Sequence, residues 1–411
     1  MNEIIINKIS GGVTAPSGFK ASGIHCGLRK NKSKLDLALI YSEKKCAAAG
    51  VFTTNKVFAA PVGVSRQHLT DGYAQAIICN SGNANTCTVD GYEKANATCK
   101  TLAEELKIAE DDIVIASTGV IGIPLPVEPI LNGIPELVSV LDSTPEAGET
   151  AALAIMTTDT KKKEYAVEYM FDGKTIKIGG ICKGSGMIQP NMATMLAFVT
   201  TDADITAPML KKALAAVVPL TFNMVSVDGD TSTNDSLIVM ASGYAGNTII
   251  DSDGSSYEAF KEALKVICTK MAKSIAADGE GATKLLECNI SNFTDAKSAM
   301  ILAKSVINSP LVKTTMFGAD ANWGRILCAL GYSGIDFNPN KVDVSFESTA
   351  GEIKVCKNGV TNPFDEDKAK TILSKDFIHI NVNMNSGDKN ATSWGCDLSY
   401  EYVRINGDYR S

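Results

Sequence analysis

The sequence predicts an α+β fold in which antiparallel or mixed sheets are combined with helices. Residues 164–171 and 175–181 flank Asp172-Gly-Lys174, a strong hairpin signal. Elsewhere apolar strands and amphipathic helices alternate without a steady βαβ repeat. A chain of 411 residues can bury a substantial core, in one large domain or two medium ones.

In the first part of the chain, short apolar runs bounded by Gly, Asn and Lys predict strands. These expected strands are residues 37–41, 50–55, 76–79, 113–116, 164–171 and 175–181. Apolar residues spaced along one face predict a helix over residues 90–106, with Asp90 as its N-cap. Residues 127–141 and 145–156 are also expected to be helical, although Pro129 and Pro135 interrupt them.

In the second part, we expect a helix over residues 208–218 ended by Pro219, a strand over 236–241 and a long helix over 256–277. The glycines of Asp278-Gly-Glu-Gly-Ala-Thr-Lys284 end that helix and mark a candidate domain boundary. The strands expected beyond it are 285–290, 342–347, 353–356, 377–384 and 394–405, and the helices are 296–307, the segment after Arg325 through Leu330, and 366–374. We therefore expect a catalytic domain of residues 1–280 and a smaller domain of residues 281–411.

Composition and charge exclude several classes of function. The net charge of −7 and the lack of a basic run give no reason to expect nucleic acid as a partner. The N-terminus lacks a secretory signal and no stretch approaches 18 apolar residues, so we expect a soluble, cytoplasmic protein without a membrane span. Eleven cysteines are scattered without a Cys-x-x-Cys pair, and Cys79, Cys182, Cys268 and Cys328 are expected to be reduced core residues.

No metal site is expected. The three histidines, His25, His68 and His379, are far apart in sequence and are expected to be structural. The acidic run Val227-Asp-Gly-Asp-Thr-Ser-Thr-Asn-Asp235 lacks the later bidentate glutamate that a calcium loop requires.

The stretch from Lys183 to Leu196, Lys-Gly-Ser-Gly-Met-Ile-Gln-Pro-Asn-Met-Ala-Thr-Met-Leu, carries the most suggestive chemistry. If the Thr194 hydroxyl attacks the carbonyl carbon of Ala193, an N-to-O acyl shift cleaves the chain and frees the α-amine of Thr194. That amine, with an ordinary pKa of ~8, can activate the hydroxyl as a nucleophile near neutral pH. The structural alternative is a glycine-rich turn that enters a buried strand at Thr194.

Thr118 and Gly119 follow another buried strand, in Ser117-Thr-Gly-Val-Ile-Gly122. A hydroxyl and a backbone N–H side by side can both donate to one developing oxyanion. The alternative is a turn in which Thr118 only caps the next segment.

Together these stretches resemble the ArgJ family of self-cleaving glutamate N-acetyltransferases, also called ornithine acetyltransferases. The 183–196 stretch is similar to the self-cleavage motif of the family, and the resemblance extends in order along the chain. The other matching stretches are 80–85, 117–122, 156–160, 227–235, 279–284, 318–325 and 402–411.

The resemblance implies a layered αββα-type core, as in DmpA and ArgJ proteins, with a smaller C-terminal α/β domain. It implies cleavage between Ala193 and Thr194 into chains that stay together, typically as an α2β2 assembly. The implied reaction of arginine biosynthesis is ping-pong: acetyl passes from N2-acetyl-L-ornithine to Thr194 and then to L-glutamate. No cofactor is implied, although some members also accept acetyl-CoA as donor.

By the same resemblance, Thr194 is the nucleophile, and Thr118 and Gly119 are the oxyanion donors. The implied substrate-binding residues are Thr157, Lys183, Thr194, Glu280, Asn406 and Ser411. Ser411 is the last residue of the chain, so its role implies that the C-terminus returns to the active site. Our own assignments are that Lys183 pairs with a substrate carboxylate and Glu280 with the ornithine ammonium. The alternatives are a self-processing amidohydrolase or aminopeptidase on the same scaffold, and a non-catalytic amino-acid-binding relative.

Overall fold

The computed structural model describes residues 4–189 and 195–407, and its contacts divide the chain into two compact units. Unit 1 comprises residues 1–184, 190–223 and 231–271, and unit 2 comprises residues 185–189, 224–230 and 272–411. The two units are described separately. The domain boundary that the sequence suggests after residue 280 stays a prediction.

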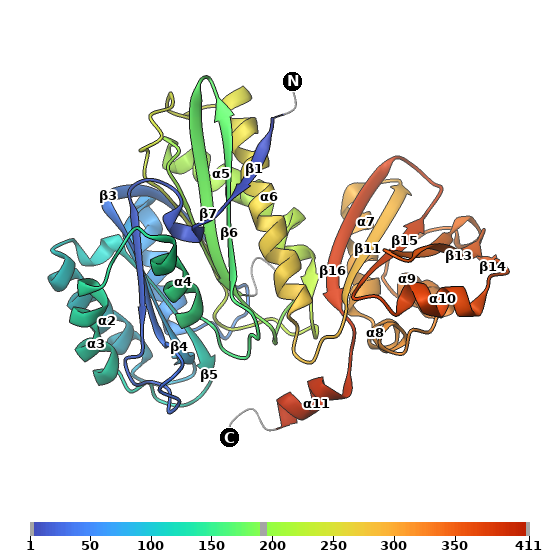
Figure 1. The fold of residues 1–411 in the computed structure, drawn as a ribbon, viewed down its shortest axis with the longest axis horizontal. Helices are drawn as coiled ribbons and strands as arrows, with labels where there is room; N and C mark the ends of the chain where they lie inside the picture. The colour runs from blue at the N-terminus through green and yellow to red at the C-terminus, as the bar shows by residue number, and fades with distance from the viewer. Residues whose placement is uncertain (1–3, 190–194, 408–411) are drawn as a thin grey trace. The chain divides into compact units, whose positions relative to one another are not determined.

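Among its described residues, unit 1 holds one mixed sheet of nine strands (Figure 1). The order is β1-β6-β7-β8-β10-β3-β4-β5, with β2 paired to β3. The strands are β1 (Ile6–Ile9), β2 (Phe19–Ile24), β3 (Leu37–Phe52), β4 (Tyr73–Asn83), β5 (Ile113–Val120), β6 (Lys163–Phe171), β7 (Lys174–Lys183), β8 (Leu196–Thr201) and β10 (Ser236–Ala241). The β6–β7 pair is the hairpin that Asp172-Gly-Lys174 predicts.

Helices cover both faces of this sheet. Helices α1 (Ala60–His68), α2 (Gly91–Leu106) and α3 (Glu128–Ser139) share a buried apolar cluster with one face of β3, β4 and β5. The opposite face is buried in a second cluster, to which α4 (Pro145–Ala154) contributes. Helix α6 (Ser255–Ala277) lies along the β7 side, where the Met271 side chain faces Gly180, and α5 (Ala207–Val217) packs near β3 (Figure 1). The predicted α+β class with a layered core is confirmed.

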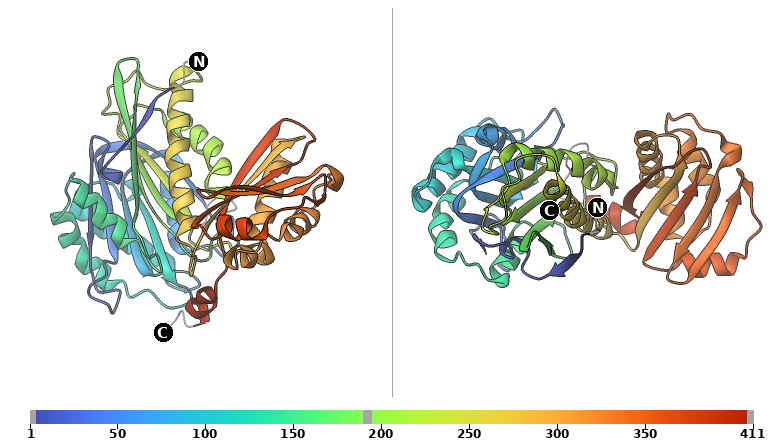
Figure 2. Two further views of the ribbon diagram at one scale, coloured as in Figure 1. Left: turned by 45° about the vertical axis from the view of Figure 1, so that its right-hand side comes forward. Right: turned by 90° about the horizontal axis from the view of Figure 1, so that it is seen from above.

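Unit 2 is built on a second mixed sheet, with the order β14-β13-β12-β15-β11-β16-β9. The strands are β9 (Val225–Ser226), β11 (Leu285–Phe293), β12 (Asp343–Ser348), β13 (Gly351–Lys357), β14 (Val360–Thr361), β15 (Phe377–Asn383) and β16 (Lys389–Cys396). The helices are α7 (Ala296–Asn308), α8 (Pro310–Phe317), α9 (Trp323–Gly331), α10 (Glu366–Leu373) and α11 (Tyr400–Gly407). Buried and more exposed residues alternate along β15, so one face of the sheet is the more buried one. Helices α7 and α10 pack against this sheet (Figure 2).

The structure corrects two expectations about the elements. The two strands expected at residues 37–41 and 50–55 are one long strand, β3, whose pairing with β4 shifts register between Tyr41 and Cys46. The strand expected over residues 394–405 is wrong, because β16 ends at Cys396 and α11 begins at Tyr400. The Ser399 hydroxyl accepts a hydrogen bond from the Glu401 N–H, which favours a helix start over the strand that Tyr400, Tyr402 and Val403 suggest.

One cysteine differs from its expected environment. Cys79, Cys182 and Cys268 are buried, but Cys328 is exposed. It lies on the outer face of α9, whose inward face is formed by Ile326, Ala329 and Leu330. Across the described part of the chain, none of the helices combines the length and apolar character that crossing a bilayer requires.

Candidate active site

The stretch that carries the predicted nucleophile connects two neighbouring strands. Strand β7 ends at Lys183, strand β8 begins at Leu196, and these two residues are paired across the antiparallel ladder. Gly184 follows β7 with φ 154°, a backbone conformation that a side chain would strain. Ala193 and Thr194 lie outside the described residues, so the predicted cleavage site and nucleophile stay predictions. The apolar run that follows them is the fully buried strand β8.

Thr118 and Gly119 lie at the end of β5, beside the end of the parallel strand β4. Gly119 has φ 136°, and a Cβ at this position would clash with the Gly82 backbone. Glycine is therefore required here both by backbone conformation and by the close approach of the two strands. The Lys183 ammonium donates to Thr118 Oγ1 at 3.4 Å. Since Lys183 can only donate, the Thr118 hydroxyl keeps its own proton for another acceptor.

A buried carboxylate, Asp159, joins the segments around Lys183. One oxygen accepts from the Lys163 ammonium at 2.6 Å and from the Gly184 N–H at 2.7 Å. The other accepts from the Thr157 N–H at 3.0 Å and lies 4.0 Å from the Lys183 nitrogen. Asp159 thus brings together two predicted substrate-binding residues, Thr157 and Lys183.

The charge of Asp159 is fixed by its neighbours. Burial alone would raise the pKa of this carboxyl, but the positive charges of Lys183 and Lys163 outweigh burial and hold the pKa below its usual range. Asp159 is therefore an anion that orients both lysines at neutral pH. Asp159 lies in the stretch 156–160 that resembles the family, but no role was predicted for it, although its spacing of four residues to Lys163 was a visible signal.

Glu280 and Asn406, two further predicted ligands, meet in unit 2. The Asn406 side-chain N–H donates to Glu280 Oε2 at 2.8 Å. The Glu280 N–H donates to the Ser185 carbonyl at 2.8 Å, and a Cβ on Gly186 would clash with the Glu280 carboxylate. Glu280 therefore touches the segment that leads toward the predicted cleavage site. Ser411 lies outside the described residues, so its role stays a prediction.

The acidic run 227–235 makes structural hydrogen bonds that were not predicted from the sequence. Asp228 accepts from the N–H groups of Met187 and Ile188 at 2.7 and 2.9 Å, and the Val227 N–H donates to the Ile188 carbonyl at 2.7 Å. Further along the run, the Asn234 amide is hydrogen-bonded to the ends of β4 and β5. An Asx-rich run after a buried strand was the signal, since such side chains readily bind backbone groups.

The three histidines make structural contacts. His68 Nδ1 lies 2.7 Å from the Ile113 carbonyl, His25 lies beside Asp36, and His379 lies beside Glu287.

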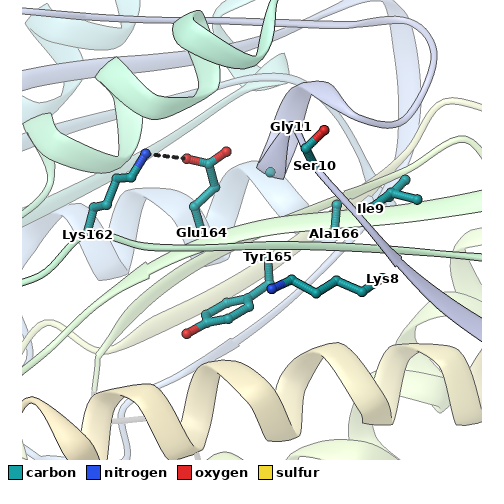
Figure 3. A pocket seen from close by; sticks show the side chains of 9 residues that line it. Lys8, Ile9, Ser10, Gly11, Lys162, Glu164, Tyr165 and Ala166 are labelled. Carbon is teal, nitrogen blue, oxygen red and sulfur yellow. Dashed lines mark ion pairs between the residues drawn. The ribbon is translucent and has the colours of Figure 1, made fainter.

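A separate cavity of about 390 Å³ lies between residues 8–12 and residues 162–166 (Figure 3). Lys162 reaches Glu149 at 2.7 Å and Glu164 at 3.8 Å. Burial raises the pKa of Glu164. None of the predicted site residues lines this cavity.

Comparisons with known proteins agree on one family. The family model described as "ArgJ family" matches residues 20–411. The "Arginine biosynthesis bifunctional protein ArgJ 1" of Clostridium acetobutylicum is 52% identical over 395 residues, 96% of each chain. The "Arginine biosynthesis bifunctional protein ArgJ" of Caldanaerobacter subterraneus subsp. tengcongensis is 51% identical over 404 residues, 98% of this chain and 99% of that one.

Among solved structures, the ornithine acetyltransferase of Mycobacterium tuberculosis, complexed with ornithine, is 38% identical. The match covers 46% of this chain and 100% of that chain, with a TM-score of 0.43. The family assignment rests on the sequence matches, which span nearly the full length. The chain belongs to the ArgJ family.

Proposed function

We propose that this protein is an N-acetyltransferase of arginine biosynthesis that moves acetyl from N2-acetyl-L-ornithine to L-glutamate. Membership in the ArgJ family and the names of its relatives support the pathway. One structural observation supports the proposed location of the active site: Lys183 contacts Thr118 and is paired with Leu196, which follows Thr194 by two residues. Lys183, the proposed substrate-binding cation at the end of β7, thus contacts the proposed oxyanion donor Thr118 at the end of β5, and it is paired with the start of β8, which the proposed nucleophile precedes.

The first step proposed is self-cleavage. Thr194 Oγ attacks the Ala193 carbonyl carbon, the C–N bond breaks, and the amide nitrogen becomes the α-amine of Thr194. Water then hydrolyses the resulting ester, which leaves a carboxylate on Ala193 and a free hydroxyl on Thr194. The products are an α chain of residues 1–193 and a β chain of residues 194–411, which we propose assemble as α2β2.

Acetyl transfer then uses the same hydroxyl. The α-amine of Thr194 takes the proton from Oγ as it attacks the acetamide carbonyl, and returns a proton to the leaving amine of ornithine. The Thr118 hydroxyl and the Gly119 N–H stabilise the tetrahedral oxyanion, and loss of one such donor costs about 2.7–4 kcal/mol of barrier. The amine of glutamate then attacks the acetyl ester, which forms N-acetylglutamate and restores Thr194. Acetyl-CoA is a further proposed donor for the same ester.

Substrate recognition is assigned by charge. Lys183 would pair with the α-carboxylate that both amino acids carry, and Thr157 lies in the segment that Asp159 ties to Lys183. Glu280, whose carboxylate Asn406 holds, would bind the side-chain ammonium that ornithine carries and glutamate lacks. Ser411 is proposed as a further ligand on family resemblance alone.

Intact-mass measurement of the purified protein tests the processing step. We expect two fragments that meet between Ala193 and Thr194, and a full-length chain for Thr194→Ala. The exposed Thr371→Ala serves as a matched control that should still cleave. A wild-type protein that stays full length would contradict self-cleavage.

Acetyl transfer is then assayed with N-acetylornithine in the presence and absence of glutamate. We expect N-acetylglutamate to form, and little acetate to be released when glutamate is absent. Rapid acetate release that glutamate does not suppress would instead favour the amidohydrolase.

A further inference from the structure

The side-chain amide of Asn234 uses its full hydrogen-bonding capacity. Its nitrogen donates to the carbonyls of Ala84 and Ser117 at 2.6 and 2.8 Å. Its oxygen accepts from the hydroxyls of Thr86 and Thr233 at 2.9 and 2.6 Å. An amide offers two donors and two acceptor lone pairs, so all four are satisfied. The orientation is thereby fixed, because a flipped amide would set its oxygen against two carbonyl oxygens.

The partners of Asn234 belong to the ends of two parallel strands. Ser117 directly precedes Thr118 on β5, and Ala84 directly follows β4. The Ser117 hydroxyl in turn donates to the Asn80 side chain at 2.6 Å, and that side chain donates to the Asn83 carbonyl at 3.0 Å. A buried polar network therefore supports the turn in which Thr118 and Gly119 lie.

Asn234 is also tied to the strand that follows the predicted nucleophile. It stands two residues before Ser236, the first residue of β10. Ser236 is paired with Leu196 of β8, and the Ser236 N–H donates to the Met195 carbonyl at 2.9 Å. This single side chain thus links the start of β10, and through it the start of β8, to the end of β5.

We propose that Asn234 is a positioning residue that sets the distance between β8, the strand that follows the predicted nucleophile, and the predicted oxyanion donors Thr118 and Gly119. The inference rests on the proposed function, because it assumes that Thr118 and Gly119 stabilise the oxyanion. One N–H group of the Asn234 amide holds the Ser117 carbonyl, and so the peptide plane before Thr118, while the other holds the Ala84 carbonyl just after β4. Oxyanion stabilisation demands this, since donors must lie within about 0.5 Å of their productive positions.

The test is Asn234→Asp, which keeps the shape of the side chain but replaces the donating nitrogen with an oxygen. We expect kcat per active site to fall roughly 10- to 100-fold, with KM for N-acetylornithine changed by less than about threefold. Active sites are counted as acetylated β chain by intact mass, so a loss of folded protein alone does not lower this kcat.

Asn247→Asp is the matched control at the other end of β10. Its amide also donates to two carbonyls, those of Asp204 and Thr248, and its oxygen accepts from the Asp204 N–H. We expect its kcat per active site to stay within about twofold of wild type. An equal fall in both variants, or no fall in Asn234→Asp, would overturn the proposal.

If Asn234→Asp does not fold, Thr86→Val decides the question, since it removes one hydrogen bond to the amide oxygen and keeps both donors of Asn234. We expect a smaller fall in kcat, roughly three- to tenfold, and recovery of most of it in Thr86→Ser, which restores the hydroxyl. Unchanged kcat in Thr86→Val would overturn the proposal. A wild-type protein without acetyl transfer would overturn the proposed function itself, whereas an active wild type with unaffected variants overturns only the role of Asn234.

Discussion

Two buried carboxylates near the predicted site residues, Asp159 and Glu280, differ in whether positive charges surround them. Asp159, in unit 1, is met by two lysines and by two backbone N–H groups. Glu280, in unit 2, is 7% exposed, yet among the described residues it forms no ion pair, and its partner Asn406 is neutral. A buried charge without a counter-ion is costly unless a ligand supplies one. The comparison indicates that Asp159 stabilises the fold, while the surroundings of Glu280 agree with the proposal that it binds a substrate ammonium.

The largest expected effect is the loss of stability in Asp159→Asn. This change removes the carboxylate charge that faces Lys163, whose side chain is 2% exposed, and Lys183. Breaking a buried pair from one side typically costs about 3–5 kcal/mol of unfolding free energy. Denaturant unfolding measures this loss of stability. The control Asp253→Asn, which breaks the exposed ion pair with Lys212, should leave the denaturant midpoint unchanged. A denaturant midpoint that is also unchanged in Asp159→Asn would contradict the structural role of Asp159.

Lys183→Met should weaken both half-reactions, because both amino acids carry an α-carboxylate. We expect kcat/KM to fall about 100-fold for N-acetylornithine and for glutamate alike, as expected for loss of a charge-assisted hydrogen bond of about 2–3 kcal/mol. Steady-state kinetics with each substrate varied in turn give both values. Lys212→Met is the control on an exposed lysine. A fall confined to one substrate would contradict carboxylate binding by Lys183.

Glu280→Gln should separate the two substrates. The glutamine side chain keeps the shape and an oxygen for Asn406 but loses the negative charge. We expect KM for N-acetylornithine to rise about tenfold, equivalent to about 1.4 kcal/mol, and KM for glutamate to change far less. Equal changes in KM for both substrates would show that Glu280 does not recognise the ammonium. Glu258→Gln, on the exposed side of α6, is the control for loss of a surface charge.

The smallest expected effect is a pH dependence of stability. The pKa of Asp159 is lowered in the folded protein, whereas in the unfolded chain it is about 3.9. The unfolded state therefore binds a proton first as pH falls, so this contribution is complete above about pH 5 and is lost progressively below it. The difference in unfolding free energy between wild type and Asp159→Asn should shrink between about pH 5 and pH 3. A difference that stays constant over this range would contradict the ionised state of Asp159.

The sequence predicted the elements whose pattern is local. Helix α2 and helix α6 begin and end within one residue of their expected bounds, because their apolar faces repeat with helical spacing. The strand predicted for the C-terminal segment was wrong. Tyr400, Tyr402 and Val403 have strand propensity, but the Ser399 cap and the tertiary context favour a helix. The capping hydrogen bond and the tertiary surroundings together outweigh the strand propensity of these residues.

In the candidate site, too, the sequence predicted what depends on neighbouring residues and missed what depends on tertiary contacts. Thr118 and Gly119 could be proposed from sequence because they are neighbours at a strand end. Asn234 could not be given a role, because its partners Ala84 and Ser117 lie 150 and 117 residues away in the chain. Asp159 was given none although Lys163 lies only four residues away, since the Gly184 N–H that completes its surroundings lies 25 residues further on, after β7. Ala84 and Ser117 come together because β4 and β5 pair in parallel, a long-range contact that no spacing near Asn234 indicates.

The most direct test of the account is the mass of the β chain after brief incubation with N-acetylornithine alone. The account predicts one added acetyl group on the fragment of residues 194–411, carried by its first residue, Thr194, and its rapid loss when glutamate is added, with N-acetylglutamate as product. A fragment that gains no acetyl group, gains it elsewhere, or loses it to water as fast as to glutamate would contradict a transferase that works through Thr194.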